Sequence, residues 1–227
     1  MKRLLQQNAV FIGLSLVLII ALGLALLLLP KGELHLLLCD RHTPARDIFY
    51  KYYTQVGEWF PYALCVLLLL FGRVGDALLA ASGLTFSALT TQFFKHIINA
   101  PRPYRWFAMN MPDISLPAVE GVRFNEWFSF PSGHTTSFFA LAFVACILLT
   151  RKPRSTKYPK MTSYAIQVVL FVAAALGAYS RIYLSQHFAL DVFAGIVVGI
   201  GITLACYAVL QRYEDQKWYN NRLFEKK

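Results

Sequence analysis

Long runs of apolar residues without a charge dominate the chain and set its expected architecture. The clearest run is 9–29, in which Ser15 carries the only hydroxyl group. About 20 apolar residues are needed for a helix to cross the hydrocarbon core of a bilayer, so this run predicts a membrane-spanning helix. The run exceeds the apolar region of a cleaved signal peptide and no small-residue cleavage site follows it, so we expect it to be retained.

The same pattern predicts an all-α protein, a six-transmembrane-helix bundle with an interfacial helix. The expected spans are 9–29, 57–71, 76–98, 134–150, 162–180 and 190–211. Aromatic residues at helical spacing within Ala45–Phe60 predict a helix that lies in the membrane interface. Small residues in the last span, among them Gly195 and Gly199, favour close helix packing. With no repeat or second domain, residues 1–227 are expected to form one integral-membrane domain.

The distribution of basic residues predicts the orientation of the protein in the membrane. The net charge is +10 although only 15% of residues are charged, and the basic residues cluster beside the apolar runs rather than in a nucleic-acid recognition motif. The loop 151–160 has five basic residues and no acid, and both ends of the chain are basic. Basic loops face the cytoplasm, so both termini are predicted to be cytoplasmic. The loops 30–56, 99–133 and 181–189 then share the outer side.

A first cluster of chemically active residues ends the third span. Lys95 is followed seven residues later by Arg102, which stands between two prolines. Proline fixes its own φ and restrains the residue before it, so Arg102 is expected in a rigid, non-helical turn. Two fixed cations make an anion site, although both residues also fit interfacial anchoring.

A second cluster, Pro131-Ser132-Gly133-His134, opens the fourth span. The first amides of a helix lack intrahelical partners and favour an anion, and Gly133 lets a ligand approach the backbone closely. His134 can donate a proton. Taken alone, Ser132 also reads as a helix cap and His134 as a structural residue.

A third cluster precedes the sixth span and contains Arg181, His187 and Asp191. The spacing of four between His187 and Asp191 predicts that they share one face of a helix. The carboxylate then holds the imidazole in one tautomer and leaves its other nitrogen as a nucleophile or base. A structural hydrogen-bonded pair remains the alternative.

Together the clusters supply three cations, a helix N-terminus, two histidines and a carboxylate, which suits phosphoryl transfer. The cations and amides stabilise the oxygens of the transferred group, one histidine attacks phosphorus and the other protonates the leaving oxygen. No acidic cluster suggests a two-metal site and no Cys/His spacing suggests zinc, so no metal or cofactor is expected.

The three patterns K-x6-RP, PSGH and SR-x5-H-x3-D resemble those of the type 2 phosphatidic acid phosphatase superfamily. All eleven fixed residues are present in order between residues 95 and 191. The resemblance implies that His187 is the nucleophile, forming a phosphohistidine, that Asp191 orients it, and that His134 protonates the leaving group. It also implies that Lys95, Arg102, Ser132, Gly133 and Arg181 bind the phosphate.

The membrane setting argues for a lipid substrate, and the predicted orientation places its phosphate at the outer face of a bacterial inner membrane, with the active site periplasmic. The motifs account for binding of the phosphate and do not distinguish between lipid substrates. We favour lipid A or undecaprenyl pyrophosphate. Arg105 and Arg123 of the loop 99–133 are extra cations that suit a second phosphate, although interfacial anchoring explains them at least as well. Phosphatidylglycerophosphate and phosphatidic acid are the alternatives.

Three alternative interpretations assign the chain to other classes of protein. A transporter explains six spans but needs polar residues at the membrane midplane, whereas the ionisable clusters all lie at one face. A vanadate-dependent oxidase binds vanadate in the same kind of phosphate pocket. Members of that branch are mostly soluble proteins, whereas this chain has long apolar spans. A non-catalytic lipid-binding protein has no need of His134, His187 and Asp191.

Overall fold

A computed structural model describes residues 1–150 and 160–222 of the protein, which are helical and contain no β-strand. The fold class is therefore all-α, as predicted. The elements in order are α1 (Lys2–Gln7), α2 (Ala9–Leu28), α3 (Lys31–Cys39), α4 (Pro44–Tyr53), η1 (Thr54–Gly57), α5 (Trp59–Leu69), α6 (Val74–Ile98), α7 (Pro103–Asn110), α8 (Gly133–Thr150), α9 (Lys160–Tyr183), α10 (Ala189–Leu210), η2 (Gln211–Tyr213) and α11 (Lys217–Asn220).

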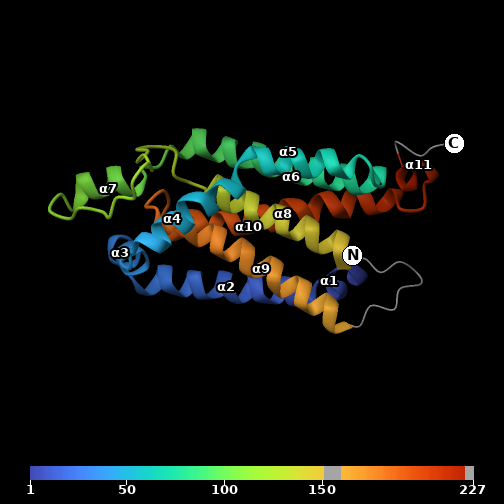
Figure 1. Ribbon diagram of the computed structural model, residues 1–227, viewed down its shortest axis with the longest axis horizontal. Helices are drawn as coiled ribbons and strands as arrows, with labels where there is room; N and C mark the ends of the chain where they lie inside the picture. The colour runs from blue at the N-terminus through green and yellow to red at the C-terminus, as the bar shows by residue number, and fades with distance from the viewer. Residues whose placement is uncertain (151–159, 223–227) are drawn as a thin grey trace.

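Helix α8 is the centre of the bundle. It packs against α6, α9 and α10, while α2 lies along α9 and α10 and α5 lies along α6 (Figure 1). The short helices α1 and α11 lie at one end of the bundle, and α3, α4 and α7 lie at the other (Figure 1). The helices that begin or end near α3, α4 and α7 therefore bring their terminal residues to a common end.

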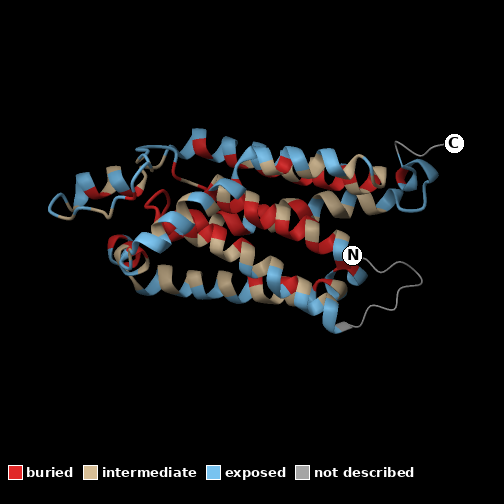
Figure 2. Cartoon of the chain, in the orientation of Figure 1, coloured by how far each residue is buried: buried red, intermediate tan, exposed pale blue. Residues whose placement is uncertain are grey.

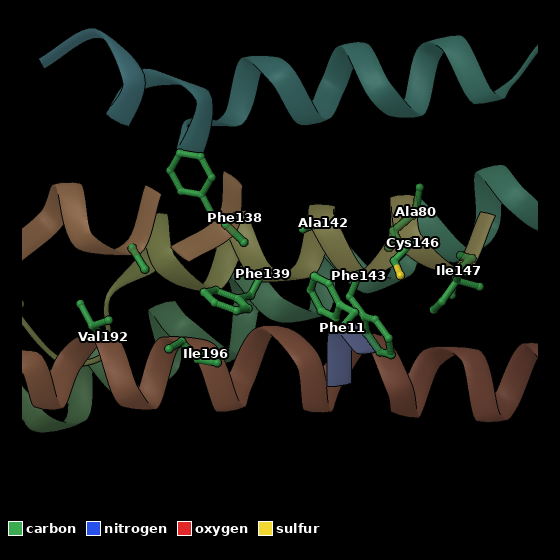
Figure 3. Close-up of a cluster of buried hydrophobic side chains, with 14 of the residues drawn as sticks. Phe11, Ala80, Phe138, Phe139, Ala142, Phe143, Cys146, Ile147, Val192 and Ile196 are labelled. Carbon is green, nitrogen blue, oxygen red and sulfur yellow. The ribbon is translucent and has the colours of Figure 1, made fainter. Parts of the chain in front are cut away.

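Burial is concentrated on α8 and on the helix faces around it (Figure 2). Phe11 of α2 stacks on Phe143 of α8, with ring centroids 5.5 Å apart, and the fully buried Phe139 lies beside them (Figure 3). Lipid tails are as apolar as this core, so van der Waals packing rather than exclusion of water holds the helices together. An aromatic pair of this kind contributes about 0.5–1.5 kcal/mol.

Two glycines of α10 allow it to approach α8 closely, as the sequence predicted. A Cβ atom at Gly199 would lie 2.5 Å from the carbonyl oxygen of Thr136, and one at Gly195 would lie 2.8 Å from that of Ser132. Any larger side chain would force the two backbones apart. Because Ser132 precedes the first turn of α8, this contact also fixes the start of α8 against α10.

Five helical segments are long and apolar enough to cross a membrane: Ala9–Leu28, Val74–Asn110, Gly133–Thr150, Met161–Tyr183 and Ala189–Tyr213. They coincide with five of the six predicted spans, and the protein is a multi-pass membrane protein. The remaining predicted span, 57–71, is the 11-residue helix α5, so the count of six is not confirmed. Apolar side chains of α2 such as Val17 and Leu27 are exposed, as expected for a surface that faces lipid.

The segment Ala45–Phe60, predicted as one interfacial helix, divides into α4, η1 and the start of α5. Helix α4 has no buried residue, and its Ile48, Phe49 and Tyr52 are exposed. This apolar surface suits the membrane interface, and the position of α4 there remains a prediction.

The short helices α3, within the loop 30–56, and α7, within the loop 99–133, were not predicted, and neither were α1 and α11 near the two ends of the chain. Residues 151–159 of the basic loop on which the orientation rests lie outside the described part of the chain. The basic residues 226 and 227 of the tail also lie outside it. The orientation of the bundle therefore remains a prediction.

Candidate active site

The three clusters meet at the end of the bundle that carries α3, α4 and α7. Each residue stands at or next to the terminus of a helix: Lys95 in the last turn of α6, Arg102 before α7, Ser132, Gly133 and His134 at the start of α8, Arg181 in the last turn of α9, His187 before α10, and Asp191 in the first turn of α10. The ends of five helices thus build a single site.

His187 reaches Asp191 from a loop rather than from a helix. Its Nδ1 lies 3.5 Å from Oδ2 of Asp191, at ion-pair distance but longer than a normal hydrogen bond. The prediction that the two residues share one helix face is wrong, because α10 begins only at Ala189. Ser185 has a positive φ of 49° and reverses the chain, after which the His187 amide donates to the Arg181 carbonyl at 3.0 Å.

Asp191 is held by two donors on the same oxygen. Its Oδ2 accepts from the Ser129 hydroxyl at 2.5 Å and from the Phe188 amide at 2.9 Å. A carboxylate near the first turn of a helix also interacts favourably with the unsatisfied amides there. Asp191 is 4% exposed, so this fixed negative charge lies within the protein beside His187.

The cations of the site are anchored by neutral oxygens. Lys95, 8% exposed, donates from Nζ to the Phe128 carbonyl at 2.5 Å, and Arg181, 6% exposed, donates from Nη1 to the Thr54 hydroxyl at 2.6 Å. The buried Nε of Arg181 has no hydrogen-bond partner among the described residues. Since a buried cation without a carboxylate partner is costly, this arrangement suits an anionic ligand.

Arg102 occupies an extended conformation directly before α7, as its position between two prolines predicted. Its Nε donates to the Trp127 carbonyl at 2.9 Å, and its Nη1 donates to the side-chain oxygen of Gln186 at 3.1 Å. These bonds engage Nε and Nη1, whereas Nη2 donates to no other described residue and remains for a ligand.

His134 stands in the first turn of α8 and packs closely on η1. A Cβ atom at Gly57 would lie 3.1 Å from Cδ2 of His134. Arg181, His187 and Arg102 are all near enough to act electrostatically on the His134 ring. The hydroxyl of Ser132 is fully buried and accepts from the Thr135 hydroxyl at 3.0 Å and from the Thr135 amide at 3.4 Å, and the second bond is the contact of a helix N-cap. Whether Ser132 and Gly133 contact phosphate remains a prediction.

The electrostatic environment keeps His187 neutral. Burial lowers its pKa well below the ordinary histidine value, and the positive charges of Arg102, Arg181 and Lys95 lower it further. A neutral imidazole retains a lone pair on one ring nitrogen, which a nucleophile requires. The cations that would attract a phosphate thus also favour the neutral form of His187, which its predicted role as nucleophile requires.

Two adjoining cavities lead away from the site between α5, α6 and α8. The smaller, about 270 Å³, is lined by His134 and Gly133 among other residues. The larger, about 420 Å³, has a mostly apolar lining that includes Tyr62, Leu84 and Ala81. Both are lined by Trp59, Ala88 and Ser137, so they are neighbours. Among the described residues, no group of three or more His, Cys, Asp or Glu side chains could hold a metal ion.

Known proteins are similar to this chain in sequence and in fold. The sequence profile of the PAP2 superfamily matches residues 76–215, which is more than half of the chain. The chain belongs to the PAP2 superfamily. This is the type 2 phosphatidic acid phosphatase superfamily expected from the motifs, and membership makes the protein a membrane lipid phosphatase.

One PAP2 relative is the lipid A 4'-phosphatase of Porphyromonas gingivalis, which is 29% identical over 186 residues covering 77% of this chain and 70% of that one. The crystal structure of Aquifex aeolicus LpxE is 25% identical, covers 78% of this chain and 93% of that one, and superposes with a TM-score of 0.62. The phosphatidylglycerolphosphate phosphatase of Bacillus subtilis shares the fold, with a TM-score of 0.66 at 18% identity over 93% of this chain and 99% of that one.

Sequence reasoning missed three residues that hold the site together. Ser129 holds Asp191, Thr54 holds Arg181 and Gln186 holds Arg102. Ser129 and Thr54 are small hydroxyl residues without a distinguishing pattern, so no signal marked them. Gln186 is a long polar residue next to His187, and that position was a signal that could have been used.

Proposed function

We propose that this PAP2 phosphatase removes a phosphate from an envelope lipid at the outer face of a bacterial inner membrane, without a metal ion and through a phosphohistidine at His187. The observation that carries the proposal is the surroundings of His187: one fixed carboxylate at 3.5 Å and three cations from three different segments acting on the same buried imidazole. This combination stabilises a phosphoryl group in transfer and orients the nitrogen that attacks it.

The reaction takes two steps. Asp191 holds the Nδ1 proton of His187, so the lone pair of Nε2 attacks phosphorus and the bond from phosphorus to the lipid oxygen breaks. His134 gives its proton to that oxygen. In the second step His134 takes a proton from water, the hydroxide attacks phosphorus, and the phosphorus–nitrogen bond breaks to release inorganic phosphate. Lys95, Arg102, Arg181 and the amides near Ser132 and Gly133 bind the phosphate oxygens throughout.

The two cavities support a lipid as the substrate. A phosphate beside His134 would leave the rest of the molecule to extend into the larger, mostly apolar cavity between α5, α6 and α8. A relative that is named a lipid A 4'-phosphatase supports lipid A as the first candidate. Undecaprenyl pyrophosphate is the second, since Arg105 and Arg123 lie on the segment 103–128 at the same end of the bundle and would suit a second phosphate.

Phosphatidylglycerophosphate is the alternative that a specific observation favours. A phosphatidylglycerophosphatase B of Bacillus subtilis is 35% identical to this chain, although over only 96 residues. Phosphatidic acid completes the set of substrates to test.

The proposed orientation places both termini in the cytoplasm and the site in the periplasm. It is supported by α1 and α11 lying at the end of the bundle opposite the site. A fluorescent protein fused to the C-terminus would then fold and fluoresce, whereas a dark but full-length fusion would argue for the opposite orientation.

The proposal is tested by phosphate release from the four lipids by the detergent-purified protein in the presence of a chelator. We expect release from at least one lipid, undiminished by the chelator, and a fall of at least about 10³-fold in His187→Ala, since the nucleophile is lost. His96→Ala is the matched control, because His96 is an exposed histidine of α6 next to Lys95. Full activity of His187→Ala, or a strict need for Mg²⁺, would contradict the proposal.

A further inference from the structure

Gln186, immediately before His187, connects three parts of the site that are far apart in sequence. Its side-chain oxygen accepts from Nη1 of Arg102 and from Nδ2 of Asn125, both at 3.1 Å. Its side-chain nitrogen donates to the carbonyl of Arg123 at 3.0 Å and to that of Leu184 at 3.4 Å. The amide makes all four hydrogen bonds that a glutamine can make, and the residue is 3% exposed.

The chemistry of the neighbours fixes which way this amide points. Arg102 can only donate, so it requires the oxygen of Gln186, and the carbonyls of Arg123 and Leu184 can only accept, so they require the nitrogen. An exchanged orientation would set the amide nitrogen against a guanidinium and its oxygen against two carbonyls. The site therefore needs a group that accepts on one side and donates on the other.

These contacts determine where the guanidinium of Arg102 lies. Its Nη1 donates to both the side-chain and main-chain oxygens of Gln186, the latter at 3.4 Å, while its Nε donates to Trp127. Among the three guanidinium nitrogens, Nη2 is the one that donates to no described residue, so it remains for a phosphate. Because Gln186 adjoins His187 in the chain, the same residue fixes the distance between this phosphate-binding cation and the nucleophile.

We propose that Gln186 is the positioning residue that holds Arg102 and the segment 111–132 against the His187 loop, so that phosphate binding depends on it. The inference rests on the proposed function of the site. Gln186 occupies one of the variable positions of the third sequence motif, and it acts through Arg102 rather than on the substrate. A misplacement of a binding group by about 1 Å can lower a rate by about 100-fold, so a residue of this kind has a measurable effect.

The variant Gln186→Met keeps the length of the side chain and removes all four hydrogen bonds. We expect kcat/KM for the lipid that wild-type protein hydrolyses to fall about 10- to 100-fold, and the inhibition constant of inorganic phosphate to rise in parallel. The matched control is Gln167→Met in α9. Gln167 is also fully buried and bonded through both ends of its amide, to the amides of Val10 and Phe11 and to the Gln7 carbonyl, but far from the site.

The control separates positioning from stability. Both variants are expected to lower the melting temperature, whereas only Gln186→Met is expected to change the kinetics of the folded fraction. In addition, Gln186→Met should add little to Arg102→Ala, because a residue that acts through Arg102 has no effect once Arg102 is absent. Wild-type kinetics in Gln186→Met, or fully additive effects in the double variant, would overturn the inference.

A different result would count against the proposed function rather than against the proposed role of Gln186. If wild-type protein releases no phosphate from any lipid, the proposed function fails, and the inference is tested by inorganic phosphate alone. Phosphate should then raise the melting temperature of wild type and of Gln167→Met, but not that of Gln186→Met. An equal rise in all three proteins would refute the role of Gln186.

Discussion

At the scale of single residues, the site combines a carboxylate and several cations around one imidazole, and they act on it in different ways. Oδ2 of Asp191 lies 3.5 Å from Nδ1 of His187, and in the proposed mechanism it favours the tautomer with a proton on that nitrogen. Burial and the cations disfavour protonation of the ring, which lowers its pKa. The result is an imidazole that is oriented and neutral at the same time, as a nucleophile for phosphorus must be.

This balance predicts a pH dependence. Since the pKa of His187 lies below the ordinary value of about 6.5, loss of activity through its protonation should begin only below that pH. Lys95→Met removes one of the cations that lower this pKa, so the pKa should rise and the acidic limb of kcat/KM should move up by about 1 pH unit. Profiles of kcat/KM against pH for the two proteins measure the shift.

The control for this shift is Lys51→Met, which removes a lysine of α4 at the same end of the bundle that is not among the cations acting on His187. Its acidic limb should coincide with that of wild type. An acidic limb at the same pH in wild type and Lys95→Met would show that the cation does not act on His187.

At the scale of helices, every chemically active group stands where a helix begins or ends, and the sequence reveals such places unevenly. The long spans are evident because runs such as 9–29 have no charge. Helix α3 is not evident from the sequence, because Lys31-Gly32-Glu33 after a proline has the composition of a loop. The helical spacing of His187 and Asp191 was misleading, because Ser185 turns the chain and Phe188, not His187, precedes the first residue of α10.

The candidate site residues could be singled out from the sequence because each belongs to a short motif. The structure brings those motifs together, while the catalytic roles of the residues remain predictions. The residues that hold the site residues in place could not be predicted, because a hydrogen bond such as that from Ser129 to Asp191 joins residues 62 apart in the sequence. Spacing along the chain carries no information about such a contact until the helices have been packed.

The cavity between α5, α6 and α8 gives a prediction at this scale. Ala81 of α6 lines only the larger, more apolar cavity, so Ala81→Trp should block a lipid tail without reaching the phosphate site. We expect the KM for the lipid to rise at least about 10-fold, while hydrolysis of a short, water-soluble phosphate ester stays within about two-fold of wild type.

Leu89→Trp is the control for bulk on α6, since Leu89 is exposed on the outer surface of the bundle. It should leave both substrates unaffected. Equal loss of the two activities in Ala81→Trp would indicate damage to the phosphate site, and unchanged lipid hydrolysis would exclude this cavity as the path of the tail.

At the scale of the whole molecule, the two ends of the bundle differ in kind. One end carries α3, α4, α7 and the described catalytic candidates, and the other carries α1 and α11 (Figure 1). A transporter needs polar groups at the membrane midplane, whereas the candidate catalytic groups of this bundle stand at helix termini at one end. The architecture therefore fits chemistry at one face of a membrane.

The most direct test of the account is to trap the phosphoryl group on the protein. The variant His134→Ala is mixed with an aryl phosphate, whose leaving group departs without a proton, then quenched in alkali and digested for mass spectrometry. Transfer to His187 should proceed, whereas its hydrolysis should be slow because the base that activates water is absent. The account predicts a phosphorylated peptide containing His187, absent from His134→Ala/His187→Ala. Release of phosphate with no phosphorylated peptide, at the same rate in both variants, would contradict it.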